Sequence, residues 1–156
     1  MVLECILSGG QTGADRAALD WAIANNVPHG GWCPLGRLAE DGRIDDQYSL
    51  RETPSPNYIQ RTEWNVRDAD ATVIFSLAPA LSGGSLATAE LAAAMGKPWL
   101  HLSASGEGDA ADRLRDFLRE HRPRTLNVAG PRTSSEPEVG EFIGTTLAAA
   151  LPVDKS

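Results

Sequence analysis

Short apolar runs alternate along the chain with longer stretches in which apolar residues recur every three or four positions. The short runs are rich in β-branched and aliphatic residues, and each is bounded by glycine, proline or polar residues, so they predict buried strands. The predicted strands span residues 2–7, 72–77, 98–102 and 125–129, and residues 30–34 are a candidate for a very short strand.

The longer stretches predict helices at residues 15–25, 56–67, 109–121 and 137–151. Ser55 is the expected N-cap of the second helix, with Pro56 as its first residue. A further helix at 86–95 is apolar almost all round and is therefore expected to be buried in the fold or in a subunit contact. The predicted inner faces are Ala18, Leu19, Ala22 and Ile23; Ile59, Thr62 and Val66; Leu114, Phe117 and Leu118; and Val139, Phe142, Ile143 and Leu147.

Strands separated by helices, with the strands themselves nearly continuously apolar, predict a parallel sheet covered by helices on both faces. The fold class is therefore α/β. With 156 residues against about 150 per domain, we expect a single domain over residues 1–156. Residues 35–56 form a long connection, which in a compact domain is usually functional or carries small structure of its own.

The composition limits the classes of partner that the protein can bind. The chain is 42% hydrophobic and 22% charged, and its formal net charge is −7. An acidic chain without a run of Lys or Arg is a poor partner for nucleic acid or an anionic membrane. Only Cys5 and Cys33 are cysteines, no apolar run is long enough to span a membrane, and the first residues lack a basic region. We therefore expect no signal peptide and a reducing, cytoplasmic setting.

The first candidate site is the loop at residues 8–15, SGGQTGAD, between a predicted strand and a predicted helix. Glycines there let the backbone approach a ligand, and the N–H groups at a helix start attract an anion. A tight turn with capping residues is the alternative. The candidate residues are Gly9, Gly10, Gln11, Thr12 and Gly13, with Asp15 and Arg16 at the helix start.

This loop matches neither standard nucleotide fingerprint. A P-loop requires Gly-Lys-Ser/Thr, and no lysine precedes Lys97. The dinucleotide pattern G-x-G-x-x-G has Ser8 in its first place, and the region around residues 29–34 has no acidic residue to hold a ribose. The sequence therefore disfavours NAD.

A second loop at residues 82–88, SGGSLAT, repeats the same chemistry with Gly83, Gly84, Ser85 and Thr88. Alone it could equally be a plain loop. Ligands of doubly wound sheets bind outside the carboxyl ends of the strands. Two such loops at those ends predict one ligand with more than one anionic or polar group.

Other residues are weaker candidates. Arg37, in the segment 30–42, could contact a phosphate or oxyanion. Trp32 is more simply a packing residue, and Cys33 a small buried one. Arg61 and Asn65, four apart at the rim of a helix face, either contact the ligand or are merely solvated.

Two kinds of catalytic site are not indicated. The histidines lack metal-ligand spacing, and the chain has no G-x-S-x-G motif. The sequence therefore predicts no protein-held metal and no hydrolytic triad.

Taken in order, SGGQTGADRAALDWAI, GGWCPLGRLAEDG, RTEWNV, SGGSLAT and TLNVAGPR resemble the molybdenum cofactor carrier family, over Ile6 to about Arg132. The resemblance implies a Rossmann-like fold, a homotetramer, and binding of the molybdenum cofactor for storage or delivery, with a molybdoenzyme as a possible acceptor. The wider group includes phosphoribohydrolases of nucleoside monophosphates with the motif P-G-G-x-G-T-x-x-E. Here Glu90 keeps its place, but Leu86 and Ala87 replace Gly and Thr.

The sequence therefore predicts non-covalent binding of the molybdenum cofactor (molybdopterin) through the two loops, without catalytic residues. Alternatives are a phosphoribohydrolase using Glu90, and a nucleotide sensor without turnover. We also expect that a bulky residue in place of Gly10 blocks binding with little loss of fold.

Overall fold

The structure is a computed structural model that describes residues 3–106 and 108–151. Five parallel strands form its central sheet. Their order across the sheet is β2-β1-β9-β7-β8. The strands are β1 (Cys5–Leu7), β2 (His29–Gly30), β7 (Ala71–Ser76), β8 (Trp99–Ser103) and β9 (Thr125–Ala129). The chain winds outward in one direction from β1 to β2 and in the other from β7 to β8, with β9 between them.

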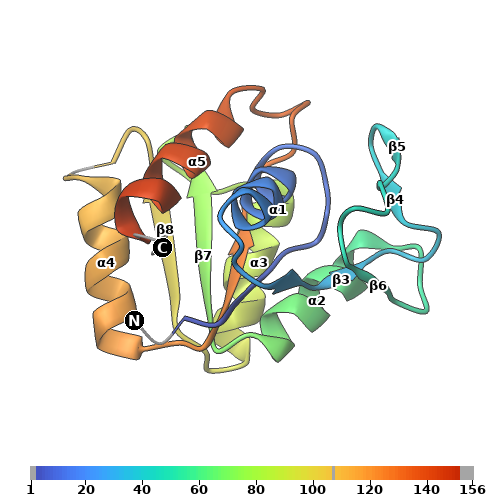
Figure 1. Ribbon diagram of the computed structural model, residues 1–156, viewed down its shortest axis with the longest axis horizontal. Coiled ribbons are helices and arrows are strands. Elements are labelled where there is room, and N and C mark those ends of the chain that lie inside the picture. The colour runs from blue at the N-terminus through green and yellow to red at the C-terminus, as the bar shows by residue number, and fades with distance from the viewer. Residues whose placement is uncertain (1–2, 107, 152–156) are drawn as a thin grey trace.

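Helices cover both faces of the sheet (Figure 1). On one face lie α1 (Ala14–Ala24), α4 (Ala110–His121) and α5 (Val139–Ala150), where α5 packs against both of the others. On the opposite face α2 (Tyr58–Asp68) packs against α3 (Gly83–Ala94). The predicted α/β fold with a parallel sheet between two helical layers is confirmed. No helix in the described ranges is long and apolar enough to cross a membrane.

The main core lies between the sheet and the layer of α1, α4 and α5. Every residue of β7 is buried, as expected for a central strand of a parallel sheet. Leu114, Phe117 and Leu118 of α4 point inward, as predicted. In α5 the predicted Val139, Ile143 and Leu147 are buried, with Phe142 partly so.

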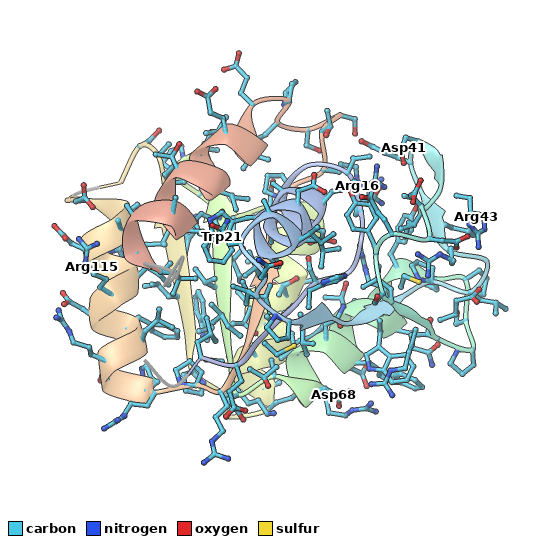
Figure 2. The ribbon with its side chains drawn as sticks, in the orientation of Figure 1. Arg16, Trp21, Asp41, Arg43, Asp68 and Arg115 are labelled. Atoms are coloured by element: carbon cyan, nitrogen blue, oxygen red, sulfur yellow. The ribbon has the colours of Figure 1, made fainter. Side chains whose placement is uncertain are left out.

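Some boundaries and faces differ from the sequence prediction. β1 begins at Cys5, and Val2 lies outside the described residues. In α1, Ile23 is 38% exposed while Trp21 is buried and points into the core (Figure 2). Helix α2 begins at Tyr58, because the side chain of Asn57 accepts a hydrogen bond from the amide of Ile59 and caps it.

The face of α2 is rotated from the predicted one. Ile59 is 47% exposed, whereas Arg61 and Asn65 are buried with Val66. The cause is polar: Asn65 Oδ1 accepts a hydrogen bond from the amide of Trp32, and its Nδ2 donates to the carbonyl of Trp32. In α3 the buried face is small and partly polar, while Leu86 is 42% exposed. Of the two expected alternatives, burial of α3 wholly within the fold is therefore wrong, and burial in a subunit contact stays a prediction.

The long connection carries small structure of its own. β3 (Trp32–Cys33) pairs in parallel with β6 (Arg51–Glu52), and β4 (Leu38–Ala39) forms a hairpin with β5 (Gly42–Arg43). Beneath them lies a second apolar cluster, formed by Leu19, Cys33, Ile44, Tyr48 and Leu50. Burial raises the pKa of the Cys33 thiol. The structure therefore uses Cys33 for packing.

Candidate functional site

A cavity of about 460 Å³ opens at the carboxyl ends of β1, β7 and β9. This is where the winding of the chain reverses, and open parallel sheets bind their ligands at such points. The volume is within the range of about 300–1,000 Å³ that is usual for small-molecule pockets. Of the predicted site residues, those that line the cavity are Gly9, Gln11, Asp15, Arg61, Asn65, Gly83, Gly84, Ser85 and Thr88.

A buried ion pair joins opposite walls of the cavity. Arg61 Nη1 of α2 lies 3.0 Å from Asp15 Oδ2 of α1, and the two side chains are only 11% and 9% exposed. Asp15 Oδ2 also accepts a hydrogen bond from the amide of Gln11. Burial raises the pKa of the Asp15 carboxyl, and the charge of Arg61 opposes that shift. A side chain at position 9 would overlap the Arg61 guanidinium, so Gly9 leaves room for the pair.

The side chain of Gln11 ties the first loop to the β4–β5 hairpin. Its Oε1 accepts hydrogen bonds from the amides of Thr12 (3.0 Å) and Glu40 (2.9 Å). Gln11 is 5% exposed, and its buried Nε2 has no hydrogen-bond partner among the described residues. Because two backbone donors fix the position of the oxygen, the remaining atom must be the nitrogen donor.

A hydrogen-bonded clasp ties the first loop to the β4–β5 hairpin and to the loop after β9; of its members only Ser134 lines the cavity, so the predicted site residue Thr12 lies outside it. Thr12 Oγ1 donates to Glu40 Oε1 (2.5 Å) and accepts from the amide of Thr133. Glu40 also accepts from the amide and hydroxyl of Ser134. These bonds, chiefly those from Ser134 and Thr12, lower the pKa of the Glu40 carboxyl. The sequence does not indicate this role of Glu40, because its partners Thr12 and Ser134 are distant in the chain.

Gly10 and Gly13 serve the backbone and do not line the cavity. Both have φ of +78°, a conformation that L side chains rarely adopt. A Cβ on Gly10 would lie 2.6 Å from Leu50 Cδ1, and one on Gly13 would lie 2.5 Å from the carbonyl oxygen of Pro131. The expectation that a bulky residue at Gly10 leaves the fold intact is therefore corrected, because the position is both strained and enclosed.

The amides of the first loop are largely committed to the protein. The amide of Gln11 donates to Asp15, that of Thr12 to Gln11 Oε1, and that of Ala14 to the carbonyl of Pro131. These three donors therefore do not remain for an anion. The prediction that this loop offers its N–H groups to a ligand is corrected at these positions.

The second loop keeps its donors. In the described ranges, the amides of Gly83, Gly84 and Ser85, which begin α3, donate no hydrogen bond to the protein. Thr88 Oγ1 instead donates to the carbonyl of Gly84, within the helix. Gly83 has φ of +53°, and a Cβ on Gly84 would meet nothing within 4 Å. The N-terminus of α3 is thus open to the cavity and carries the positive end of the helix dipole.

Arginines 16 and 37 are placed elsewhere. Arg16 pairs with Asp41 at 2.5 Å and donates to the carbonyl of Gly10 (Figure 2). Arg37 is buried, and its guanidinium donates to backbone carbonyls. It does not line the cavity, so the predicted contact of Arg37 with a phosphate or oxyanion is corrected. Those carbonyls belong to Ile44, Asp45, Tyr48 and Leu50.

Several cavity residues were not predicted from the sequence. Arg132 and Glu136 reach the cavity from the loop after β9, and Glu136 accepts hydrogen bonds from the amides of Leu77 and Ala78. The guanidinium carbons of Arg61 and Arg132 each lie 5.3 Å from the ring centroid of Tyr58. Only the place of this loop in the sequence could have indicated these residues, because the loop follows the carboxyl end of a predicted strand, as the two glycine loops do.

The charged side chains that line the cavity are two arginines and two carboxylates. Two arginines, Arg61 and Arg132, face two carboxylates, Asp15 and Glu136, so the charged lining is balanced. The described residues contain no group of three or more His, Cys, Asp or Glu side chains that could hold a metal ion. Glu90, required by the hydrolase interpretation, is exposed and does not line the cavity.

Comparison with known proteins places the chain. The family described as the circularly permutated YpsA SLOG family matches residues 6–151. The crystal structure of a protein named putative molybdenum carrier protein, from Syntrophus aciditrophicus SB, is 42% identical in sequence. The similarity covers 96% of each chain with a TM-score of 0.92. No curated protein matches the chain significantly.

Proposed function

Because the chain belongs to the circularly permutated YpsA SLOG family, we propose that it is a carrier of the molybdenum cofactor, bound non-covalently as cargo. The observation that carries this proposal is the cavity at the switch point of the sheet, where uncommitted amide donors meet a balanced set of charged groups. Support also comes from the name of the similar protein of known structure, which describes a molybdenum carrier.

The anionic end of the cargo would lie at the N-terminus of α3. Gly83, Gly84 and Ser85 supply backbone donors there, and helix N-termini attract anions. Arg132 adds a positive charge at the same cavity. The first loop is less suited to an anion, because its amides are committed and the carboxylate of Asp15 lies beside it.

The test is anaerobic binding of isolated molybdenum cofactor, with AMP and ADP-ribose as competitors and a product assay on the same samples. Tight cofactor binding, protection of the cofactor from oxidation and no nucleotide cleavage are expected. Failure to bind the cofactor, with a response to nucleotides, would replace the carrier by a nucleotide sensor. Release of free base and ribose 5-phosphate from AMP would replace it by a phosphoribohydrolase.

Charge placement gives a sharper variant. Gly84→Asp puts a carboxylate in the first turn of α3, where the helix dipole favours it and no atom obstructs a Cβ. The fold is expected to persist while an anionic cargo is repelled. Gly144→Asp, on α5 with equally open space, adds the same charge away from the cavity and should leave cargo affinity unchanged.

We also propose self-association, as the family resemblance implies for a homotetramer. Leu86 of α3 and Ile59 of α2 are exposed apolar side chains on the same helical layer, and Trp99 of β8 is 41% exposed. Light scattering at several concentrations tests this. A monomer at all of them would contradict it.

A further inference from the structure

We propose that Gln11 and Asp15 together recognise the edge of a heterocycle on which a carbonyl oxygen stands beside an N–H group, as on pterins and guanine. This inference rests on the proposed function, because it assigns the uncharged end of the cargo to the same cavity. In this inference, Gln11 and Asp15 determine which heterocycle is bound and do not bind the anionic group.

The donor of this pair is Gln11 Nε2. It is buried, it belongs to a side chain that lines the cavity, and it has no partner among the described residues. Buried donors in native proteins are nearly always satisfied, so an unpartnered one at a cavity wall indicates an acceptor from outside the chain. The bonds that Oε1 accepts from Thr12 and Glu40 hold the amide in one orientation.

The acceptor of the pair is the carboxylate of Asp15. Its Oδ2 accepts from Arg61 and from the amide of Gln11, but a carboxylate offers about four acceptor positions. The carboxylate therefore has acceptor positions left for a ligand, and the bond from Arg61 holds it in a fixed orientation. A donor and an acceptor on the same wall complement a ring edge that presents the opposite pair.

Charge argues against a phosphate at this end. A phosphate beside Gln11 would also face the carboxylate of Asp15, whose balancing cation, Arg61, is already engaged at 3.0 Å. An uncharged ring edge meets no such repulsion. The anion and the ring thus occupy opposite ends of the cavity, with the anion at the start of α3.

Purine nucleotides with the same phosphate separate ring reading from anion binding. Titration calorimetry is expected to show that GMP and IMP, which share the carbonyl and N–H edge, bind more tightly than AMP by about tenfold, the worth of one or two matched hydrogen bonds. AMP presents an amine where GMP presents a carbonyl, and that amine cannot accept from Gln11. The ring nitrogen beside it carries no hydrogen to donate to Asp15. Equal affinities for GMP and AMP, or no binding of GMP, would overturn the inference.

Gln11→Glu is the matched variant, because it keeps an oxygen for the amides of Thr12 and Glu40 and replaces only the donor. It should abolish the preference for GMP over AMP. Gln47→Glu, on an exposed turn, adds the same charge and should retain the preference. Should Gln11→Glu fail to fold beside Asp15, Gln11→Met removes the donor without adding charge and should likewise abolish the preference. Retention of the wild-type ratio in a folded Gln11 variant would overturn the inference.

Nuclear magnetic resonance gives a readout that affinity alone does not. The side-chain NH2 signals of Gln11, assigned by their loss in the variant, should shift with GMP but not with AMP. Equal shifts with both would mean that Nε2 meets only water or a phosphate, and would overturn the inference. Cofactor binding with no GMP preference would defeat this inference alone, whereas a Gln11-dependent GMP preference without cofactor binding would defeat only the proposed cargo.

Discussion

Arg61 Nη1 lies 3.0 Å from Asp15 Oδ2, although the two residues are 46 positions apart in the chain. The pair joins the start of α1 to the buried face of α2, and both residues line the cavity. Both side chains are about nine-tenths buried, so a charge left without its partner would be poorly hydrated. The pair thus links the geometry of the site to the stability of the fold.

We therefore expect Arg61→Met to lower the free energy of unfolding by about 3–5 kcal/mol, because it strands the buried carboxylate of Asp15. The double variant Asp15→Asn/Arg61→Met should recover much of this loss, since it leaves no unpaired charge. Urea denaturation of both variants provides the measurement. Arg43→Met, which breaks an exposed pair with Asp46, is the control and should change stability little. If the double variant were no more stable than Arg61→Met, an unpaired carboxylate would not be the cause.

Two glycines of the predicted loops should respond oppositely to alanine. Gly10→Ala forces a Cβ into a left-handed conformation and against Leu50, so we expect a loss of about 1–3 kcal/mol. Gly84→Ala meets no atom within 4 Å and has no positive φ, so it should be neutral or stabilise α3 by up to about 1 kcal/mol. Thermal and urea unfolding measure both. Equal stability of the two variants would contradict the assignment of Gly10 to the backbone.

Arg37 is expected to matter for stability and not for affinity. Its guanidinium donates to the carbonyls of Ile44, Asp45, Tyr48 and Leu50, which the connection between β4 and β6 brings around it. Arg37→Met keeps the apolar stem but leaves buried carbonyls unpaired, each at about 1–3 kcal/mol, so a total loss of several kcal/mol is expected. At a temperature where the variant is folded, its affinity for the cargo should equal that of the wild type. Weaker binding by a folded variant would place Arg37 in the site after all.

The parts of the fold that follow from local pattern were predictable. A short apolar run that is rich in β-branched residues, such as β7, indicates a buried strand, and parallel strands bring the loops after β1 and β7 to one edge of the sheet. That reasoning brought Gly9 and Gln11 together with Gly83 and Ser85 before any contact was known.

The parts that failed depend on distant partners. An arginine such as Arg37 looks like a surface charge until a long connection folds its own carbonyls around it. For Asn65 the sequence left ligand contact and simple solvation open, and it could not show that Trp32, far away in the chain, holds this side chain inward. Adjacent glycines can also have different roles that the sequence does not distinguish. Gly10 adopts the positive φ of the turn, whereas Gly9 leaves room for the ion pair. The periodicity of apolar residues predicts none of these contacts.

The clasp at Glu40 should make stability depend on pH. Hydrogen bonds from Ser134 and Thr12 lower the pKa of Glu40 in the folded protein, so the folded state binds fewer protons at this residue than the unfolded chain. The stability that the clasp contributes is therefore complete above the ordinary glutamate pKa of about 4.3, and it is lost as the pH falls through the lower value of the folded state.

The measurement compares wild type with Glu40→Gln, which can still accept hydrogen bonds but does not titrate. Between about pH 5 and pH 3 the urea midpoint of the wild type should fall more steeply than that of the variant. Asp41 and Asp68, whose pKa values are also lowered, give both proteins a common slope, so the difference reports Glu40 alone. Glu141→Gln, at an exposed position of α5, should follow the wild type. Parallel curves for wild type and Glu40→Gln would show that Thr12 and Ser134 hold the clasp together without help from the carboxylate charge.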